Sequence, residues 1–86
     1  MQIVFLNSYL DDYDDLTAQD KERVQRAIHR LGDDWRHPGL GVKRVQGKDD
    51  VWEARASLSL RITFQIIGDT IRLRNVGAHD KTLKDA

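Results

Sequence analysis

The chain has 86 residues, of which 40% are hydrophobic and 33% charged, with no cysteine and a formal net charge of zero. These values are typical of one globular domain spanning residues 1–86, and they exclude a disordered chain, a disulfide scaffold and any cysteine-based site. The sequence has no run of about 20 apolar residues and no secretory signal at its start, so we expect a cytoplasmic protein without membrane association.

The charges are unevenly distributed along the chain. Residues 1–20 contain five aspartates and no lysine or arginine, whereas residues 21–86 contain all 14 basic residues and nine acidic ones, a net charge of +5. A basic surface on this second part would suit an anionic partner such as a nucleic acid. The acidic run is explained more simply as the solvated face of a helix.

The chain opens with a predicted strand and a first helix. Residues 2–6 (QIVFL) are rich in β-branched and aromatic side chains, which favours a short strand. Asn7 or Ser8 can cap the helix that follows. The inward stripe of this helix would comprise Tyr9, Leu10, Tyr13 and Leu16.

A second helix and a loop follow. Thr17 and Asp20 have the spacing of a capping box, so the helix is expected from Ala18 onward. Gly32 lies where a left-handed residue would end it. Residues 33–41 hold the only proline and two glycines and predict a loop.

The remainder of the chain alternates between apolar and polar residues and predicts an antiparallel sheet. The expected strands are 42–46, 51–57, 60–67 and 70–76, and Gly68-Asp69 forms a two-residue hairpin turn. This turn sets Ile67 opposite Thr70, so the same register pairs Phe64 with Leu73 and Thr63 with Arg74.

Each face of this sheet has a distinct composition. The apolar face would carry Trp52, Ala54, Leu60, Ile62, Phe64, Ile66, Ile71 and Leu73. The polar face would gather Glu53, Arg55, Arg61, Thr63, Gln65, Arg72 and Arg74. We therefore expect an α+β fold, with the N-terminal strand and a two-helix hairpin packed on the apolar face of a twisted antiparallel sheet.

The order of these elements and three short motifs resemble the RelE/ParE superfamily of bacterial toxins. The motifs are Trp52-x-x-Arg55, the strand start Leu60-Arg61-Ile62-Thr63-Phe64, and the ending Gly77-Ala78-His79-Asp80. The resemblance covers nearly the whole chain and implies the RelE-like fold and a cognate antitoxin as partner. RelE-like members cleave mRNA in the ribosomal A site, whereas ParE-like members act on DNA gyrase and are not nucleases.

The resemblance also implies a site for metal-independent RNA cleavage, which needs cations for the phosphorane charge and groups that transfer protons. Arg61, and after it Arg55, would bind the phosphate. His79 would donate or accept a proton. Glu53 is either a general base or a charge partner of these arginines. Further RNA contacts are expected from Lys43, Arg44, Arg72, Arg74 and Lys81.

Simpler interpretations exist for each candidate. Arginines on a strand are ordinary surface residues, and His79 could cap the sheet or bond to Asp80. His29 and His37 lack metal-ligand spacing, so no metal or cofactor is expected. Trp52 belongs to the core, whereas Trp35 could pack or stack on a base.

The sequence also departs from the ribonuclease pattern. No tyrosine or phenylalanine follows Phe64, and Leu83 occupies the neighbourhood of the usual C-terminal tyrosine. Glu53 and Arg55 stand where some members have lysines, and the net charge is zero. Three hypotheses remain: a ribosome-dependent mRNA endoribonuclease, which we favour, a toxin that acts by protein contact alone, and a degenerate non-toxic relative. An antitoxin segment would lie on an edge strand or in the cleft beside the helices.

Overall fold

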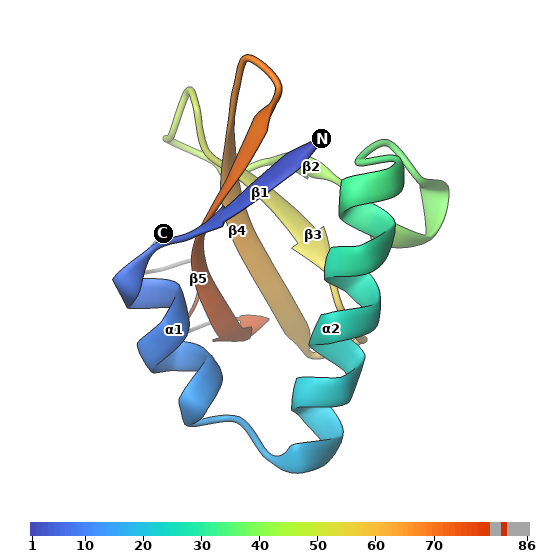
Figure 1. Ribbon diagram of the computed structural model, residues 1–86, viewed down its shortest axis with the longest axis vertical. Helices are drawn as coiled ribbons and strands as arrows, with labels where there is room; N and C mark the ends of the chain where they lie inside the picture. Colours follow the sequence, from blue (N-terminus) through green and yellow to red (C-terminus); the bar gives the residue numbers. More distant parts are fainter. Residues whose placement is uncertain (80–81, 83–86) are drawn as a thin grey trace.

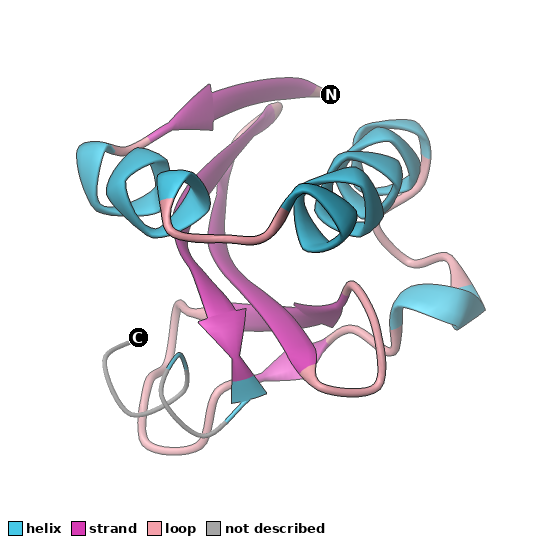
Figure 2. Cartoon of the chain, turned by 90° about the horizontal axis from the view of Figure 1, so that it is seen from below, coloured by secondary structure: helices cyan, strands magenta, loops and turns pink. Residues whose placement is uncertain are grey.

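The computed structural model describes residues 1–79 and residue 82. The elements of this part are β1 (Gln2–Phe5), α1 (Asn7–Asp14), α2 (Ala18–Asp33), the 3-10 helix η1 (Pro38–Leu40), β2 (Lys43–Arg44), β3 (Trp52–Arg55), β4 (Leu60–Ile67) and β5 (Thr70–Ala78). The strands form a sheet in the order β1-β5-β4-β3-β2, and α1 and α2 lie side by side on one face of it (Figure 1). The view from below shows these two layers, with both helices on the same side (Figure 2). The expected α+β fold is confirmed.

The sheet is mixed, because β1 joins it in parallel. Gln2 lies opposite Thr70 and Phe5 opposite Leu73, which places β1 at the edge beside β5. The antiparallel pairing predicted for β2 to β5 is confirmed. The N-terminal strand was expected to pack with the helices on the apolar face, whereas β1 forms an edge strand of the sheet itself. A short isolated strand carries no local signal for the direction of its partner, which is decided by how the helical hairpin packs.

The predicted hairpin between β4 and β5 is confirmed near its turn. Gly68 adopts a φ of +57°, a left-handed conformation that favours glycine, and Ile67 lies opposite Thr70. The register continues as predicted to Phe64 opposite Leu73.

A β-bulge then shifts this register by one residue. Thr63 pairs with Asn75, so the predicted pairing with Arg74 is wrong, and Arg74 is the extra residue on β5. Because of this shift Val76 turns to the core, where only 2% of its surface is exposed.

The core lies between the helices and the apolar face of the sheet. The sheet contributes Ala54, Leu60, Ile62, Phe64, Ile71, Leu73 and Val76, and the helical segments contribute Tyr9, Val24, Ala27, Leu31 and Leu40. Trp52 packs against this core, which confirms its predicted inward orientation. Its ring meets the ring of Trp35 edge to face, with the two ring centres 5.8 Å apart. Burial, with a smaller contribution from Tyr13, raises the pKa of Tyr9.

The helix ends confirm one predicted cap and correct two. The Thr17 hydroxyl accepts a hydrogen bond from the Asp20 amide at 3.1 Å, as expected. The N-cap of α1 is Leu6, without a side-chain cap, because the extended chain of β1 runs directly into the helix. Asn7 and Ser8 therefore lie inside α1. No helix in the described part of the chain has the length and apolar character needed to cross a membrane.

Gly32 does not end α2, which continues to Asp33. A Cβ added at Gly32 would lie 3.2 Å from the Ile3 side chain. The glycine thus permits a close approach of α2 to β1, a requirement of packing and not of helix termination.

Helix α1 covers the edge of β5 where β1 has ended. The Leu6 amide donates to the Leu73 carbonyl at 3.1 Å, and the Ser8 hydroxyl donates to the Arg74 carbonyl. One carboxylate oxygen of Asp12 accepts hydrogen bonds from the Val76 amide at 3.2 Å and from the Asn75 side chain at 3.0 Å. These bonds satisfy backbone groups that would otherwise form an exposed sheet edge.

Replacing Asp12 with alanine should lower the free energy of unfolding by about 1–3 kcal/mol, because the Val76 amide would lose its acceptor. Asp11→Ala is the matched control, since Asp11 is an exposed neighbour on the same helix. It should change stability by less than about 0.5 kcal/mol. Urea unfolding followed by circular dichroism measures both, and equal losses would contradict the role given to Asp12.

Candidate active site

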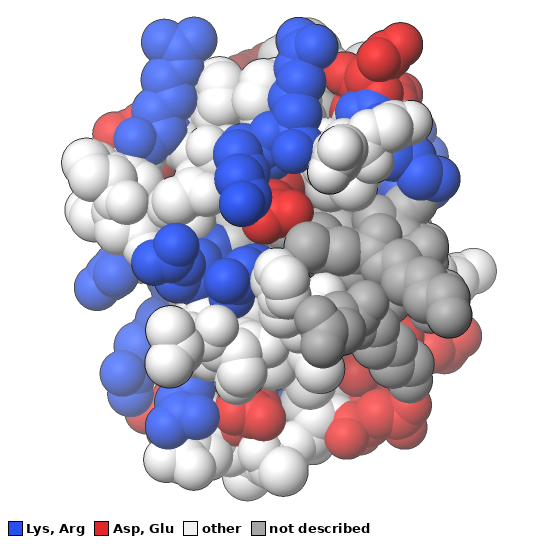
Figure 3. Space-filling view, turned by 180° about the vertical axis from the view of Figure 1, so that it is seen from behind, with Lys and Arg blue, Asp and Glu red and all other residues white. Residues whose placement is uncertain are grey.

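The polar face of the sheet is turned away from the helices (Figure 3). On this face basic side chains gather towards one side, and acidic side chains gather at the opposite lower corner. Cross-strand pairing arranges the candidate residues in two adjacent rows, namely Lys43, Glu53, Thr63 and Asn75, and then Arg55, Arg61 and Gly77. Because paired residues lie about 5 Å apart, Glu53, Arg55 and Arg61 form one cluster.

Glu53 is a buried carboxylate with two cationic neighbours. Only 4% of the residue is exposed, and its Oε1 lies 3.8 Å from Lys43 Nζ and 3.9 Å from Arg61 Nε. A carboxylate removed from water costs several kcal/mol unless charges of opposite sign compensate it. The geometry therefore favours Glu53 as a charge partner over Glu53 as a base that contacts a ribose.

Arg61 connects this carboxylate to the loop between β3 and β4. Its side chain is 13% exposed, and its Nη1 donates to the backbone carbonyls of Ser57, Leu58 and Leu60 at 2.9 to 3.1 Å. Its Nη2 makes no hydrogen bond to any residue in the described part of the chain. Nη1 thus holds the loop, while Nε lies beside the Glu53 carboxylate.

Arg55 lies directly opposite Arg61 across β3 and β4. Two like charges facing each other across strands are destabilising, and within residues 1–79 the only carboxylate paired with Arg61 is that of Glu53. Arg55 itself is exposed and makes no ion pair with a described residue; its guanidinium lies beside Gly41. The two arginines therefore place two positive charges on neighbouring strands, compensated among the described residues by the one carboxylate of Glu53.

Arg72 and Arg74 form a second basic cluster on the same face. Both donate to Gln65 Oε1, at 3.3 and 3.2 Å, and Gln65 Nε2 donates to Asp50 at 2.7 Å. Gln65 follows Arg61 by four residues, which is about 13 Å along β4. The two clusters therefore lie along one continuous surface.

His79 follows β5 directly and extends its pairing with the start of β4. Its backbone amide donates to the Ser59 carbonyl at 2.8 Å, one pair beyond Leu60 and Ala78. The residue is exposed. This position lies near the strand end that carries Arg61.

One other predicted RNA-binding residue, Arg44, is not brought to this cluster. The Arg44 guanidinium lies over the Trp52 ring, with its Cζ 5.1 Å from the ring centre. Since Trp52 belongs to the core side of the sheet, Arg44 is on the opposite side from Glu53. Lys81 lies outside the described residues, as do Asp80 and Leu83.

Among residues 1–79 and Thr82, no group of three or more histidine, aspartate or glutamate side chains is arranged to hold a metal ion.

No protein-family model and no curated protein sequence matches this chain. Its three-dimensional structure does match solved structures. A copper-bound mutant toxin from Helicobacter pylori has a TM-score of 0.78 at 18% identity, covering 94% of this chain and 97% of that one. The RelB–RelE antitoxin–toxin complex from Methanococcus jannaschii gives 0.74 at 19%, covering 91% of this chain and 92% of the matched one. The intact E. coli RelBE toxin–antitoxin complex gives 0.71 at 16%, covering 90% and 94%.

The chain has the RelE-like toxin fold. The resemblance carried by the sequence motifs is thereby confirmed at the level of the fold. Similarity below 20% identity shows the fold alone, so activity has to be argued from the side chains on this RelE-like framework.

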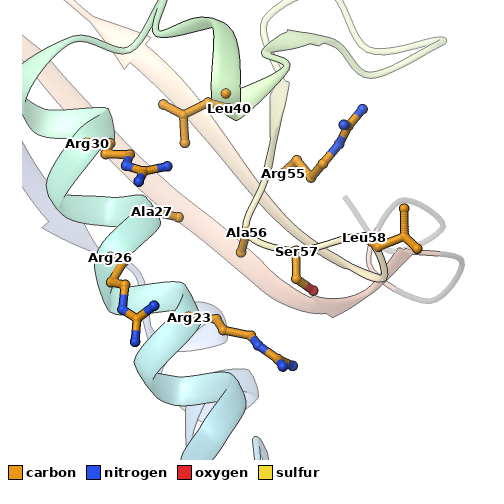
Figure 4. A pocket seen from close by; sticks show the side chains of 10 residues that line it. Arg23, Arg26, Ala27, Arg30, Leu40, Arg55, Ala56, Ser57 and Leu58 are labelled. Atoms are coloured by element: carbon orange, nitrogen blue, oxygen red, sulfur yellow. The ribbon is translucent and has the colours of Figure 1, made fainter.

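Three arginines on α2 were not predicted as site residues from the sequence. Arg23, Arg26 and Arg30 line a groove whose other wall includes Arg55 (Figure 4). Their spacing of three and four residues places them on one face of a helix. This spacing is the feature of the sequence from which a basic helix face could have been predicted. On sequence grounds they are ordinary solvated positions, because nothing in the sequence shows that α2 lies beside the segment that joins β3 to β4.

Arg61→Ala should lower the free energy of unfolding by about 2–3 kcal/mol, because three loop carbonyls and the buried Glu53 lose their partner. Adding Glu53→Gln should recover part of this loss, since no buried charge is then left uncompensated. Chemical unfolding of the two single variants and the double variant measures the coupling.

Arg55→Ala is the control for this cycle. Arg55 occupies the matching position on β3, and its removal relieves a like-charge contact, so stability should stay within about 0.5 kcal/mol of wild type. A loss as large as that of Arg61→Ala, or strict additivity with Glu53→Gln, would contradict this description.

Proposed function

We propose that this chain is the toxin of a toxin–antitoxin system and that it cleaves mRNA at the ribosome without a metal ion. The observation that carries the proposal is the direct pairing of Arg55 and Arg61, with the single buried carboxylate of Glu53 beside them. The arrangement leaves an excess of positive charge on a surface that continues to Arg72 and Arg74. The RelE-like fold supports the same proposal.

In the proposed reaction the ribose 2′-oxygen attacks the adjacent phosphorus. The new bond joins the 2′-oxygen to phosphorus, and the bond from phosphorus to the 5′-oxygen breaks. The products are a 2′,3′-cyclic phosphate and a 5′-hydroxyl. Arg55 and the Nη2 group of Arg61 stabilise the charge that develops on the phosphate oxygens. Glu53 positions Arg61. The 2′-hydroxyl loses its proton to solvent water, and His79 donates a proton to the leaving 5′-oxygen.

We propose a cognate antitoxin as the protein partner. The M. jannaschii and E. coli structures that share this fold are complexes with antitoxins. An apolar groove between α1 and α2 matches the predicted cleft beside the helices, and its lining residues are Phe5, Tyr9, Leu10, Tyr13, Gln25 and Ile28. Phe5 and Leu10 are 47% and 44% exposed there, so an amphipathic antitoxin helix could bury them.

The same groove supports a second candidate function, a toxin that inhibits a protein target by contact alone. The zero net charge also favours this candidate, because binding to ribosomal RNA is helped by a strong positive field. The two candidates differ in whether mRNA is cut.

Expression from a tightly regulated promoter in a bacterium tests the proposal. The wild type should arrest growth and produce new mRNA 5′ ends inside translated codons. Arg55→Ala and His79→Ala should each reduce these cuts at least about tenfold, since each removes one of the groups that act on the phosphate or transfer a proton. Growth curves and mapping of 5′ ends provide the measurements.

Lys48→Ala is the control, because Lys48 is an exposed cation in the turn between β2 and β3. It should cut as the wild type does. Arrest without cuts would move the assignment to the protein-contact toxin. An absence of arrest in the wild type would contradict both toxin functions.

A further inference from the structure

A groove lies between α2 and the segment that joins β3 to β4. Arg23, Arg26 and Arg30 project from α2 on one side, and Arg55 extends from β3 on the other (Figure 4). Ala27, Leu40 and Ala56 also line the groove, which has a volume of about 350 Å³. The groove is separate from the apolar groove between α1 and α2.

The groove keeps a positive charge after its ion pairs are counted. Arg23 pairs with Asp20 at 3.1 Å, and Arg26 pairs with Glu22. These are exposed contacts within one helix, which contribute little energy and leave the guanidinium groups free to exchange partners. Arg30 and Arg55 make no ion pair within the described residues.

Arg23, Arg26 and Arg30 are distributed along the axis of α2 and do not converge on one position. From Arg23 to Arg30 the helix rises by about 10 Å. Arg55 borders the groove on the other side, with its guanidinium directed away from α2 (Figure 4). The groove residues Ser57 and Leu58 accept hydrogen bonds from Arg61, the residue proposed to hold the reacting phosphate. A row of guanidinium groups suits a ligand with regularly repeated negative charges.

We infer that this groove binds the phosphodiester backbone of single-stranded RNA next to the bond that is cleaved. The inference rests on the proposed function for its ligand. RNA is favoured over an acidic protein segment because the groove ends at Ser57 and Leu58, whose carbonyls bind Arg61 of the proposed phosphate site. A protein segment would also use apolar anchors, which the groove between α1 and α2 offers through Phe5 and Leu10.

The test is fluorescence anisotropy of the purified full-length chain with a labelled single-stranded RNA of about 12 nucleotides. A 2′-O-methyl group on every ribose prevents attack by the 2′-oxygen, so binding is measured without cleavage. The variant is Arg23→Gln with Arg30→Gln, which leaves Arg55 and Arg61 in place. Lys21→Gln is the control, because Lys21 lies on a different face of α2, over the Tyr13 ring. Circular dichroism verifies that each variant is folded.

The double variant should bind about tenfold more weakly in low salt. The slope of log Kd against log salt concentration should fall by about 1.4, or 0.7 for each phosphate that the variant no longer neutralises. Lys21→Gln should keep the wild-type slope. An unchanged slope in the double variant, or no salt-dependent binding by the wild type, would overturn the inference.

A labelled polyglutamate peptide of the same charge tests the competing ligand. Tighter binding of this peptide than of RNA, abolished in the double variant, would assign the groove to an acidic protein segment and overturn the inference. The groove and the proposed function fail separately. If mRNA is cut in cells but the double variant keeps the wild-type salt slope, only the inference about the groove fails. If the double variant has a reduced slope but no mRNA is cut in cells, only the nuclease proposal fails.

Discussion

The guanidinium group of Arg61 is the contact on which the polar side of this structure depends. One of its nitrogens donates to the Ser57 and Leu58 carbonyls in the loop between β3 and β4 and to that of Leu60 at the start of β4, and another lies beside the buried carboxylate of Glu53. The same loop supplies Ser57 and Leu58 to the α2 groove. A single side chain therefore fixes the position of the proposed phosphate site and of the groove wall next to it. This dual role explains why a loss of activity on replacing Arg61 has to be separated from a loss of folding.

The remaining framework supplies a rigid support for this contact. The apolar face of β4 and β5 packs against the helices, and α1 closes the edge of β5 through Asp12. The bulge at Arg74 changes which residues of β5 face each side, and it allows Arg72 and Arg74 to meet at Gln65 while Val76 returns to the core. The basic surface is thus a consequence of the register and not only of composition.

The sequence predicted those features that local chemistry determines. Alternation assigned Phe64 to the core and Arg61 to the polar face, and the turn at Gly68 determined the pairing as far as Leu73. The cluster of Glu53, Arg55 and Arg61 followed from that alternation together with the family resemblance.

Features that depend on tertiary packing were not predictable in this way. The parallel direction of β1, the bulge at Arg74 and the use of Gly32 for close packing against Ile3 all require knowledge of a distant partner. The same reason applies to the arginines of α2, whose relation to Arg55 appears only when the helix is placed on the sheet. Lys43 and Arg44 are adjacent on β2, so only Lys43 shares the face of Glu53, whereas the Arg44 guanidinium lies over the Trp52 ring on the other face.

We propose that this face of the sheet cleaves RNA through the ribose 2′-hydroxyl. The most direct measurement uses purified protein, ribosomes and an mRNA with a single 2′-deoxynucleotide at the bond cut in the unmodified message. We predict that the unmodified message yields a 2′,3′-cyclic phosphate and a 5′-hydroxyl, and that the 2′-deoxy message is not cut at that bond. Cleavage of the 2′-deoxy bond, or products with a 5′-phosphate, would contradict the account.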